Sequence, residues 1–302
     1  MKMQRHIVLA MLAAVLFGAP AVAQDKRQDK IKVVATFSIL GDLVKNVGGD
    51  RVEVATLVGP NGDAHVYSPA PGDARTLAAA KLVFVNGLGF EGWIARLVKA
   101  SGTKAPTVVA SKAIRPRQME DEHHRGKMVT DPHAWQSVAN AKVYVANIRD
   151  GLAKADPPGK AVYEANTTAY LAKLDALEAE IRAAIGKIPA DRRKVITNHE
   201  ALGYFGEAYG VEFISPGVST DAEPSAQDIA KIIAQVRKQK IPAVFLENIS
   251  DPRLMQQIAR ETGAKIGGTL FSDALSPLGG PAATYTEMMR HNVRELSRAL
   301  VP

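Results

Sequence analysis

The stretch that decides the fold is residues 160–187, KAVYEANTTAYLAKLDALEAEIRAAIGK. It contains no proline, and its only glycine is Gly186, near its end. Apolar residues recur in it at steps of three and four, the period of a helix with one buried face; they are Tyr163, Tyr170, Leu171, Leu174, Leu177 and Ile181. At 1.5 Å per residue, such a helix spans about 40 Å. A compact domain rarely needs that length, so the stretch predicts a rigid strut that joins two lobes.

Short β-branched runs alternate with helical patterns on the N-terminal side of this strut. The runs predict strands over 32–37, 51–58, 82–86 and 107–110, and the helical patterns cover 39–47, 73–80, 90–100 and 138–154. Ser38 is in the position of an N-cap for the helix over 39–47. Strands that are separated by helices pair in parallel, so this part predicts a lobe built of βαβ units.

The same alternation returns after the strut. Strands are expected over 195–198, 211–213, 243–247 and 265–269, with helices over 201–209, from Ser225, from Asp251-Pro252 to Gly263, and over 284–300. The predicted fold class is α/β, with two lobes, each a mostly parallel sheet flanked by helices, joined by one long rigid helix. We expect an N-terminal lobe over 24–157, a linker helix over 158–188 and a C-terminal lobe over 189–302.

Residues 1–23 have the layout of a cleaved secretory signal. Lys2 and Arg5 precede an apolar run over 7–17, which is too short to cross a bilayer that needs about 20 residues. Small residues then precede a cleavage site near Ala23/Gln24. An uncleaved anchor helix is the alternative. Because the chain has no cysteine, a lipid anchor is not expected either, so the mature protein is predicted to be in the periplasm and not lipid-anchored.

The composition excludes two classes of site. The formal charge is +7, but Lys and Arg do not cluster as they do in proteins that bind nucleic acid. The absence of cysteine excludes thiolate ligands, so any metal ion must be bound by nitrogen and oxygen atoms.

Three histidines lie at the edges of the predicted lobes. His65 is in a loop after a strand, His133 precedes a helix, and His199 directly follows a strand, while Asp273 lies in the loop after the last strand. Parallel α/β sheets bind ligands beyond the carboxyl ends of their strands, which favours a site here. A lone loop histidine is more often an ordinary surface residue. Spacing alone cannot bring these four residues together, so the pattern indicates a plausible site and no more.

Five stretches in order along the chain resemble the metal-binding solute-binding proteins of ABC transporters, the cluster A-I family. Residues 62–73 contain HVYSP, similar to the His-x-Tyr-x-Pro stretch of the family, and 131–135 (DPHAW) resembles its Asp-Pro-His-x-Trp motif. The stretches 198–205 (NHEALGYF), 219–225 (STDAEPS) and 271–275 (FSDAL) match the remaining landmarks. The resemblance covers essentially the whole mature chain, including the long helix.

The resemblance implies that His65 and His133 from the first lobe and His199 and Asp273 from the second bind one ion between the lobes. Three neutral imidazoles and one carboxylate suit a tetrahedral ion at about 2.0–2.2 Å. The family usually has proline where this chain has Ala64, a change that could loosen the loop without removing a ligand.

The implied function is the capture of a divalent ion and its delivery to an ABC-type permease and, through it, an ATPase. We expect a monomer that is not an enzyme and does not bind nucleic acid. Zinc is expected because nitrogen-rich sites favour it, whereas the manganese-preferring subgroup usually has glutamate in place of His199. A manganese or iron binder of the same transporter class is the alternative. A zinc-dependent hydrolase with Glu200 as general base and an adhesin-like surface protein are the remoter ones.

Several further expectations concern the surroundings of the ion. Asp63, Glu200 and Glu247 are candidates to orient the imidazoles, and each could instead be a solvated or capping carboxylate. The loop Glu120–His124 could gather metal ions or be a polar loop. His291 is expected to be an ordinary surface histidine. The long helix predicts small lobe motions, and proton competition predicts that affinity falls below about pH 6.

Overall fold

The computed structural model describes residues 30–121, 126–216, 220 and 224–302. The predicted signal peptide over 1–23, residues 122–124 of the loop considered for metal gathering, and most of the motif over 219–225 lie outside the described residues.

The N-terminal lobe is built on a parallel sheet of four strands in the order β2-β1-β3-β4. Its strands are β1 (Ile31–Phe37), β2 (Val52–Val58), β3 (Leu82–Val85) and β4 (Thr107–Val109), and its helices are α1 (Ser38–Gly48), α2 (Pro71–Ala78), α3 (Ile94–Ser101) and α4 (Val138–Ala155). The β-branched runs form the central strands because a parallel sheet covered on both faces buries both sides of each strand.

The C-terminal lobe repeats this plan with a parallel sheet in the order β10-β9-β7-β8. Its strands are β7 (Lys194–Ile196), β8 (Glu212–Ile214), β9 (Ala243–Glu247) and β10 (Lys265–Leu270), and its helices are α6 (Gly203–Tyr209), α7 (Ala226–Gln239), α8 (Arg253–Thr262) and α9 (Tyr285–Leu300). The predicted α/β class with two parallel sheets is confirmed. The chain limits that we gave to the lobes stay predictions.

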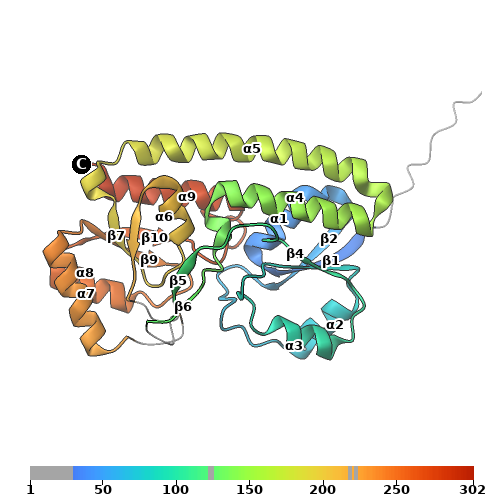
Figure 1. Ribbon diagram of the computed structural model, residues 1–302, viewed down its shortest axis with the longest axis horizontal. Coiled ribbons are helices and arrows are strands. Elements are labelled where there is room, and N and C mark those ends of the chain that lie inside the picture. Colours follow the sequence, from blue (N-terminus) through green and yellow to red (C-terminus); the bar gives the residue numbers. More distant parts are fainter. Residues whose placement is uncertain (1–29, 122–125, 217–219, 221–223) are drawn as a thin grey trace, which may run out of the picture.

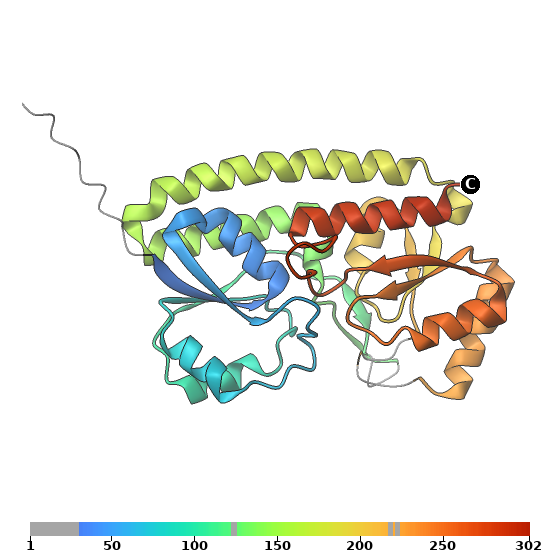
Figure 2. The same ribbon diagram turned by 180° about the vertical axis from the view of Figure 1, so that it is seen from behind.

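Helix α5 (Lys160–Gly186) is the predicted strut, and it is 27 residues long. It lies along both lobes, over α4 on one side and α9 on the other (Figure 1), and the view from behind shows the same arrangement (Figure 2). Its buried residues fall on one face, and they are Tyr163, Thr167, Tyr170, Leu174, Leu177, Ile181 and Ile185. Because this face packs on helices of both lobes, a wide hinge motion would expose it.

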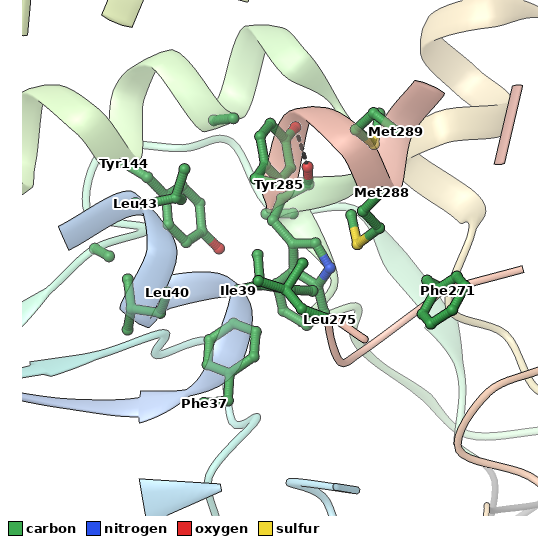
Figure 3. Packing of buried hydrophobic residues seen from close by; sticks show 14 of the residues in the cluster. Phe37, Ile39, Leu40, Leu43, Tyr144, Phe271, Leu275, Tyr285, Met288 and Met289 are labelled. Atoms are coloured by element: carbon green, nitrogen blue, oxygen red, sulfur yellow. Dashed lines mark hydrogen bonds between the residues drawn. The ribbon is translucent and has the colours of Figure 1, made fainter. Parts of the chain in front are cut away.

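One hydrophobic core continues from the first lobe into the second. Phe37, Leu40 and Leu43 of the N-terminal lobe and Leu275 and Tyr285 of the C-terminal lobe belong to the same buried cluster, and Figure 3 shows them side by side. A second, smaller core lies within the C-terminal lobe. Since buried apolar area stabilises by about 25 cal/mol per Å², the shared core opposes separation of the lobes.

Ser38 does not cap α1 as we expected. Helix α1 begins at Ser38 itself, Phe37 is the N-cap residue, and no side chain caps it. The Ser38 hydroxyl accepts a hydrogen bond from the backbone N–H of Leu275 at 2.9 Å. The hydroxyl therefore joins the two lobes, and this long-range bond replaces the local one that the sequence pattern favours.

A small antiparallel hairpin, which the sequence pattern did not predict, projects from the N-terminal lobe toward the C-terminal one (Figure 1). Its strands are β5 (Gln118–Glu120) and β6 (Met128–Thr130). The other strands were predicted from β-branched runs, and β5 contains none, because its residues are Gln118, Met119 and Glu120.

Among the helices in the described part of the chain, none is both long enough and apolar enough to cross a membrane.

The burial of Asp42, in α1 against the start of α9, makes stability depend on pH. The carboxylate accepts a hydrogen bond from the Tyr285 backbone N–H at 2.9 Å. Burial raises the pKa of Asp42 to about 6, although the bond from Tyr285 opposes the rise. The folded protein thus keeps a proton that the unfolded chain releases, and the free energy of unfolding falls as the pH rises from about 4 to about 6.

We therefore expect the stability of Asp42→Asn relative to the wild type to increase as the pH rises through this window. Urea unfolding at several pH values measures the difference, and the exposed Asp50→Asn serves as the control. Parallel stability curves for the wild type and Asp42→Asn would contradict the assignment.

Candidate metal centre

Four side chains that lie far apart in the sequence meet between the lobes. His65, His133, His199 and Asp273 each offer one ligand atom, and these atoms all lie within 4.8 Å of one another. His65 is in the loop after β2, His199 follows β7 and Asp273 follows β10, so three of the four come from loops beyond the carboxyl ends of strands. His133 heads a short 3₁₀ helix over Ala134–Gln136.

The distances among the four atoms suit a single ion. Nε2 of His65 lies 3.0 Å from Nε2 of His133 and 3.3 Å from Oδ2 of Asp273. Nε2 of His199 is 3.0 Å from Oδ2 of Asp273, and Nε2 of His133 is 3.8 Å from Oδ1. Tetrahedral bonds of about 2.0–2.2 Å separate ligand atoms by about 3.3–3.6 Å. The group could therefore surround one dication with little movement.

The four side chains differ in their access to solvent. Those of His133 and Asp273 are 0% exposed and that of His199 is 1% exposed, whereas 24% of the His65 side chain is exposed. His65 is thus the member of the group that faces the outside.

A carboxylate lies against Nδ1 of two of the imidazoles. Oδ1 of Asp131 accepts hydrogen bonds from Nδ1 of His133 at 2.8 Å and from its backbone N–H at 3.0 Å. Oε2 of Glu247 lies 2.7 Å from Nδ1 of His199, and Oε1 accepts from the backbone N–H groups of Asn198 and His199. With the proton on Nδ1, each ring presents the lone pair of Nε2 to the centre.

Of the three carboxylates expected to orient the imidazoles, only Glu247 contacts a ring. Asp63 accepts from the backbone N–H of His65 at 2.8 Å and so orders the loop rather than the imidazole. Glu200 faces Arg117 at 3.5 Å. Asp131 was missed, although its place two residues before His133 in the same motif was a usable signal.

Strong interactions among buried charges define the electrostatics of the group. Burial alone would raise the pKa of Asp273, but His133 and His199 hold it well below its usual range. Burial alone would lower the pKa of His199, but Glu247 and Asp273 raise it well above 6.5. The pKa of His133 is raised in the same way, against burial, by Asp273 and Asp131.

His291 differs from our expectation of an ordinary surface histidine. It is half-buried, Nε2 lies 2.9 Å from the carbonyl oxygen of Thr269, and the ring packs edge-on against Phe271. It is a structural residue that does not belong to the four-residue group.

The raised histidine pKa values predict how ion binding depends on pH. A proton held by His199 or His133 must leave before Nε2 can bind an ion. As the pH is lowered, the affinity should therefore begin to fall while the pH is still above 6.5. An unperturbed imidazole would give this fall only at about pH 6. Chelator competition at a series of pH values measures this, together with proton release by calorimetry in buffers of different ionisation enthalpy. His291→Gln should follow the wild-type curve, and a constant affinity from pH about 5.5 to 8.5 would contradict the prediction.

Comparison with known proteins gives matches over nearly the whole chain. The family model of the periplasmic zinc-uptake complex component A, ZnuA, matches residues 33–299. The manganese ABC transporter substrate-binding lipoprotein PsaA of Streptococcus pneumoniae is 32% identical over 305 residues, covering 97% of each chain. The iron-binding protein YfeA of Yersinia pestis is 32% identical over 288 residues, covering 94% of this chain and 91% of YfeA. The structure of the periplasmic zinc binding protein TroA from Treponema pallidum superposes with a TM-score of 0.83 at 31% identity, covering 90% of this chain and 100% of TroA.

These relatives correct one expectation and establish the family. PsaA is named a lipoprotein, so the expectation of a protein that is not lipid-anchored is wrong; it rested on the absence of cysteine alone, whereas this family includes lipid-anchored members. The extent of the matches shows that the chain belongs to the ZnuA family of metal-binding substrate-binding proteins of ABC transporters, which are not enzymes.

Proposed function

We propose that the chain binds one divalent metal ion through His65, His133, His199 and Asp273 outside the cytoplasmic membrane. It delivers the ion, as a monomer, to the permease of an ABC transporter and through it to the ATPase. The observation that carries this proposal is the convergence of four donor atoms, two from each lobe, within 4.8 Å in a largely buried place.

Zinc is the ion that the donor set favours. Three imidazole nitrogens and one carboxylate form a nitrogen-rich group, which suits zinc, while manganese prefers more oxygen donors. TroA is named a zinc binding protein, which supports this choice. PsaA and YfeA are named for manganese and iron, so manganese or iron is the second candidate.

Capture and release are proposed to need only small movements of the lobes. Helix α5 packs on both lobes, and the hydrophobic core is continuous between them. His65 is the ligand with solvent access, so displacement of its loop gives the ion a path without opening the shared core.

Substitution of His199 tests both the site and the choice of metal. His199→Ala should lower zinc affinity by more than about 100-fold, since loss of a ligand costs more than the 10–100-fold typical of its hydrogen-bonded neighbours. His199→Glu should shift the preference toward manganese because it exchanges a nitrogen donor for oxygen. Competition titration of zinc against manganese measures both variants, with His291→Gln as the control.

The outcomes separate the site from the metal. Zinc binding that survives His199→Ala would overturn the ligand assignment. Wild-type protein that prefers manganese or iron in the titration, and carries that metal when isolated from its native compartment, would replace zinc but leave the site intact.

A further inference from the structure

Arg117, which directly precedes β5, is joined to a proposed metal ligand through one carboxylate. Its Nη1 donates to Oδ2 of Asp131 at 2.9 Å, and the other oxygen of Asp131 holds Nδ1 of His133 at 2.8 Å. Asp131 is fully buried, whereas 27% of the Arg117 side chain is exposed. The guanidinium therefore lies at the outer end of a short chain of contacts that ends at Nε2 of His133.

The same guanidinium faces the other lobe. Nη1 lies 3.5 Å from Oε1 of Glu200, and Nε lies 4.0 Å from Oε2 of Glu207. The side chain also lies so close to Gly203, the first residue of α6, that a methyl group there would overlap it. Arg117 thus passes from the N-terminal lobe onto the helix that follows His199.

A tyrosine hydroxyl from α6 completes the contact between the lobes. The hydroxyl of Tyr204 accepts from the backbone N–H of Arg117 at 2.8 Å and donates to the carbonyl oxygen of Asp131 at 3.1 Å. Tyr204 is 5% exposed. Tyr204 thus connects α6 to the backbone of both Arg117 and Asp131.

We propose that Arg117 is a positioning residue for the metal site, which orients the Asp131 carboxylate and hence His133 and makes that orientation depend on the position of the C-terminal lobe. This inference rests on the proposed function, because it concerns affinity at the same site. The planar guanidinium can contact Asp131 and Glu200 together while it lies against Gly203. A lysine ammonium is a point charge and cannot reproduce this arrangement.

Electrostatics alone predicts the opposite effect, which makes the proposal testable. A positive charge near a dication repels it, so removal of Arg117 would tighten binding if charge were its only contribution. Arg117 faces the carboxylates of Asp131, Glu200 and Glu207, so removal of its charge would leave more negative charge near the ion. The two explanations therefore differ in the sign of the change for Arg117→Ala and in the outcome for Arg117→Lys.

The experiment measures zinc affinity by chelator competition in full-length mature protein whose folding has been checked by thermal unfolding. Arg117→Ala and Arg117→Lys should both weaken binding by about tenfold. Tyr204→Phe, which changes no charge, should weaken it in the same direction. Arg115→Ala is the matched control, because Arg115 is exposed two residues away and should leave affinity within about twofold. The visible absorption spectrum of the Co²⁺-loaded protein should change in Arg117→Lys but not in Arg115→Ala.

A double-mutant cycle tests whether Arg117 acts through Asp131. In an Asp131→Asn background, Arg117→Ala should have little further effect, since the carboxylate that it orients is gone. Equal losses in both backgrounds would overturn the proposal, as would wild-type or tighter binding by Arg117→Lys and Arg117→Ala. Wild-type affinity in Tyr204→Phe would overturn the link to the second lobe.

A crystal structure of metal-free Arg117→Ala decides the matter without reference to metal binding. The contact of 2.8 Å between Asp131 and Nδ1 of His133 should be lost or displaced. A wild-type protein that binds no divalent ion would refute the proposed function, while an unchanged contact in this variant would refute the role of Arg117 alone.

Discussion

The structure depends on one buried carboxylate. Asp273 comes from the C-terminal lobe, is inaccessible to solvent, and has the imidazoles of His65, His133 and His199 as its neighbours. An isolated buried charge is costly, so it must be paired, and two of its three partners belong to the other lobe. Neither lobe alone can satisfy this group. The long helix and the shared core keep the lobes at the separation that the pairing requires.

Side chains of each lobe donate hydrogen bonds to backbone carbonyl groups of the other lobe, close to the proposed ligands. Nε1 of Trp135 and Nε2 of Gln136 both donate to the carbonyl oxygen of Ser272, the residue before Asp273, at 3.0 and 2.6 Å. The hydroxyl of Tyr285 donates to the carbonyl oxygen of Trp135 at 2.8 Å. Each lobe is therefore hydrogen-bonded to the other within a few residues of its own proposed ligands. A small displacement between the lobes would change the distances within the four-residue group.

The sequence revealed what is periodic or local, and it did not reveal what depends on distant contacts. Helix α5 and the central strands follow from apolar spacing, and His133 follows from its motif. The partner of the Ser38 hydroxyl is 237 residues away, so the local capping pattern was misleading. The link from Arg117 to Asp131 was invisible for a similar reason: it is set by how the hairpin folds back, which no spacing in the sequence records.

The single exposed imidazole has a kinetic consequence. In the proposed site a competing chelator meets only the His65 imidazole, because the other three groups are buried. If removal of the ion requires the His65 loop to move, the protein and not the chelator sets the rate of that step. The rate of ion removal should then level off at high chelator concentration, and this plateau is the rate at which the protein opens by itself.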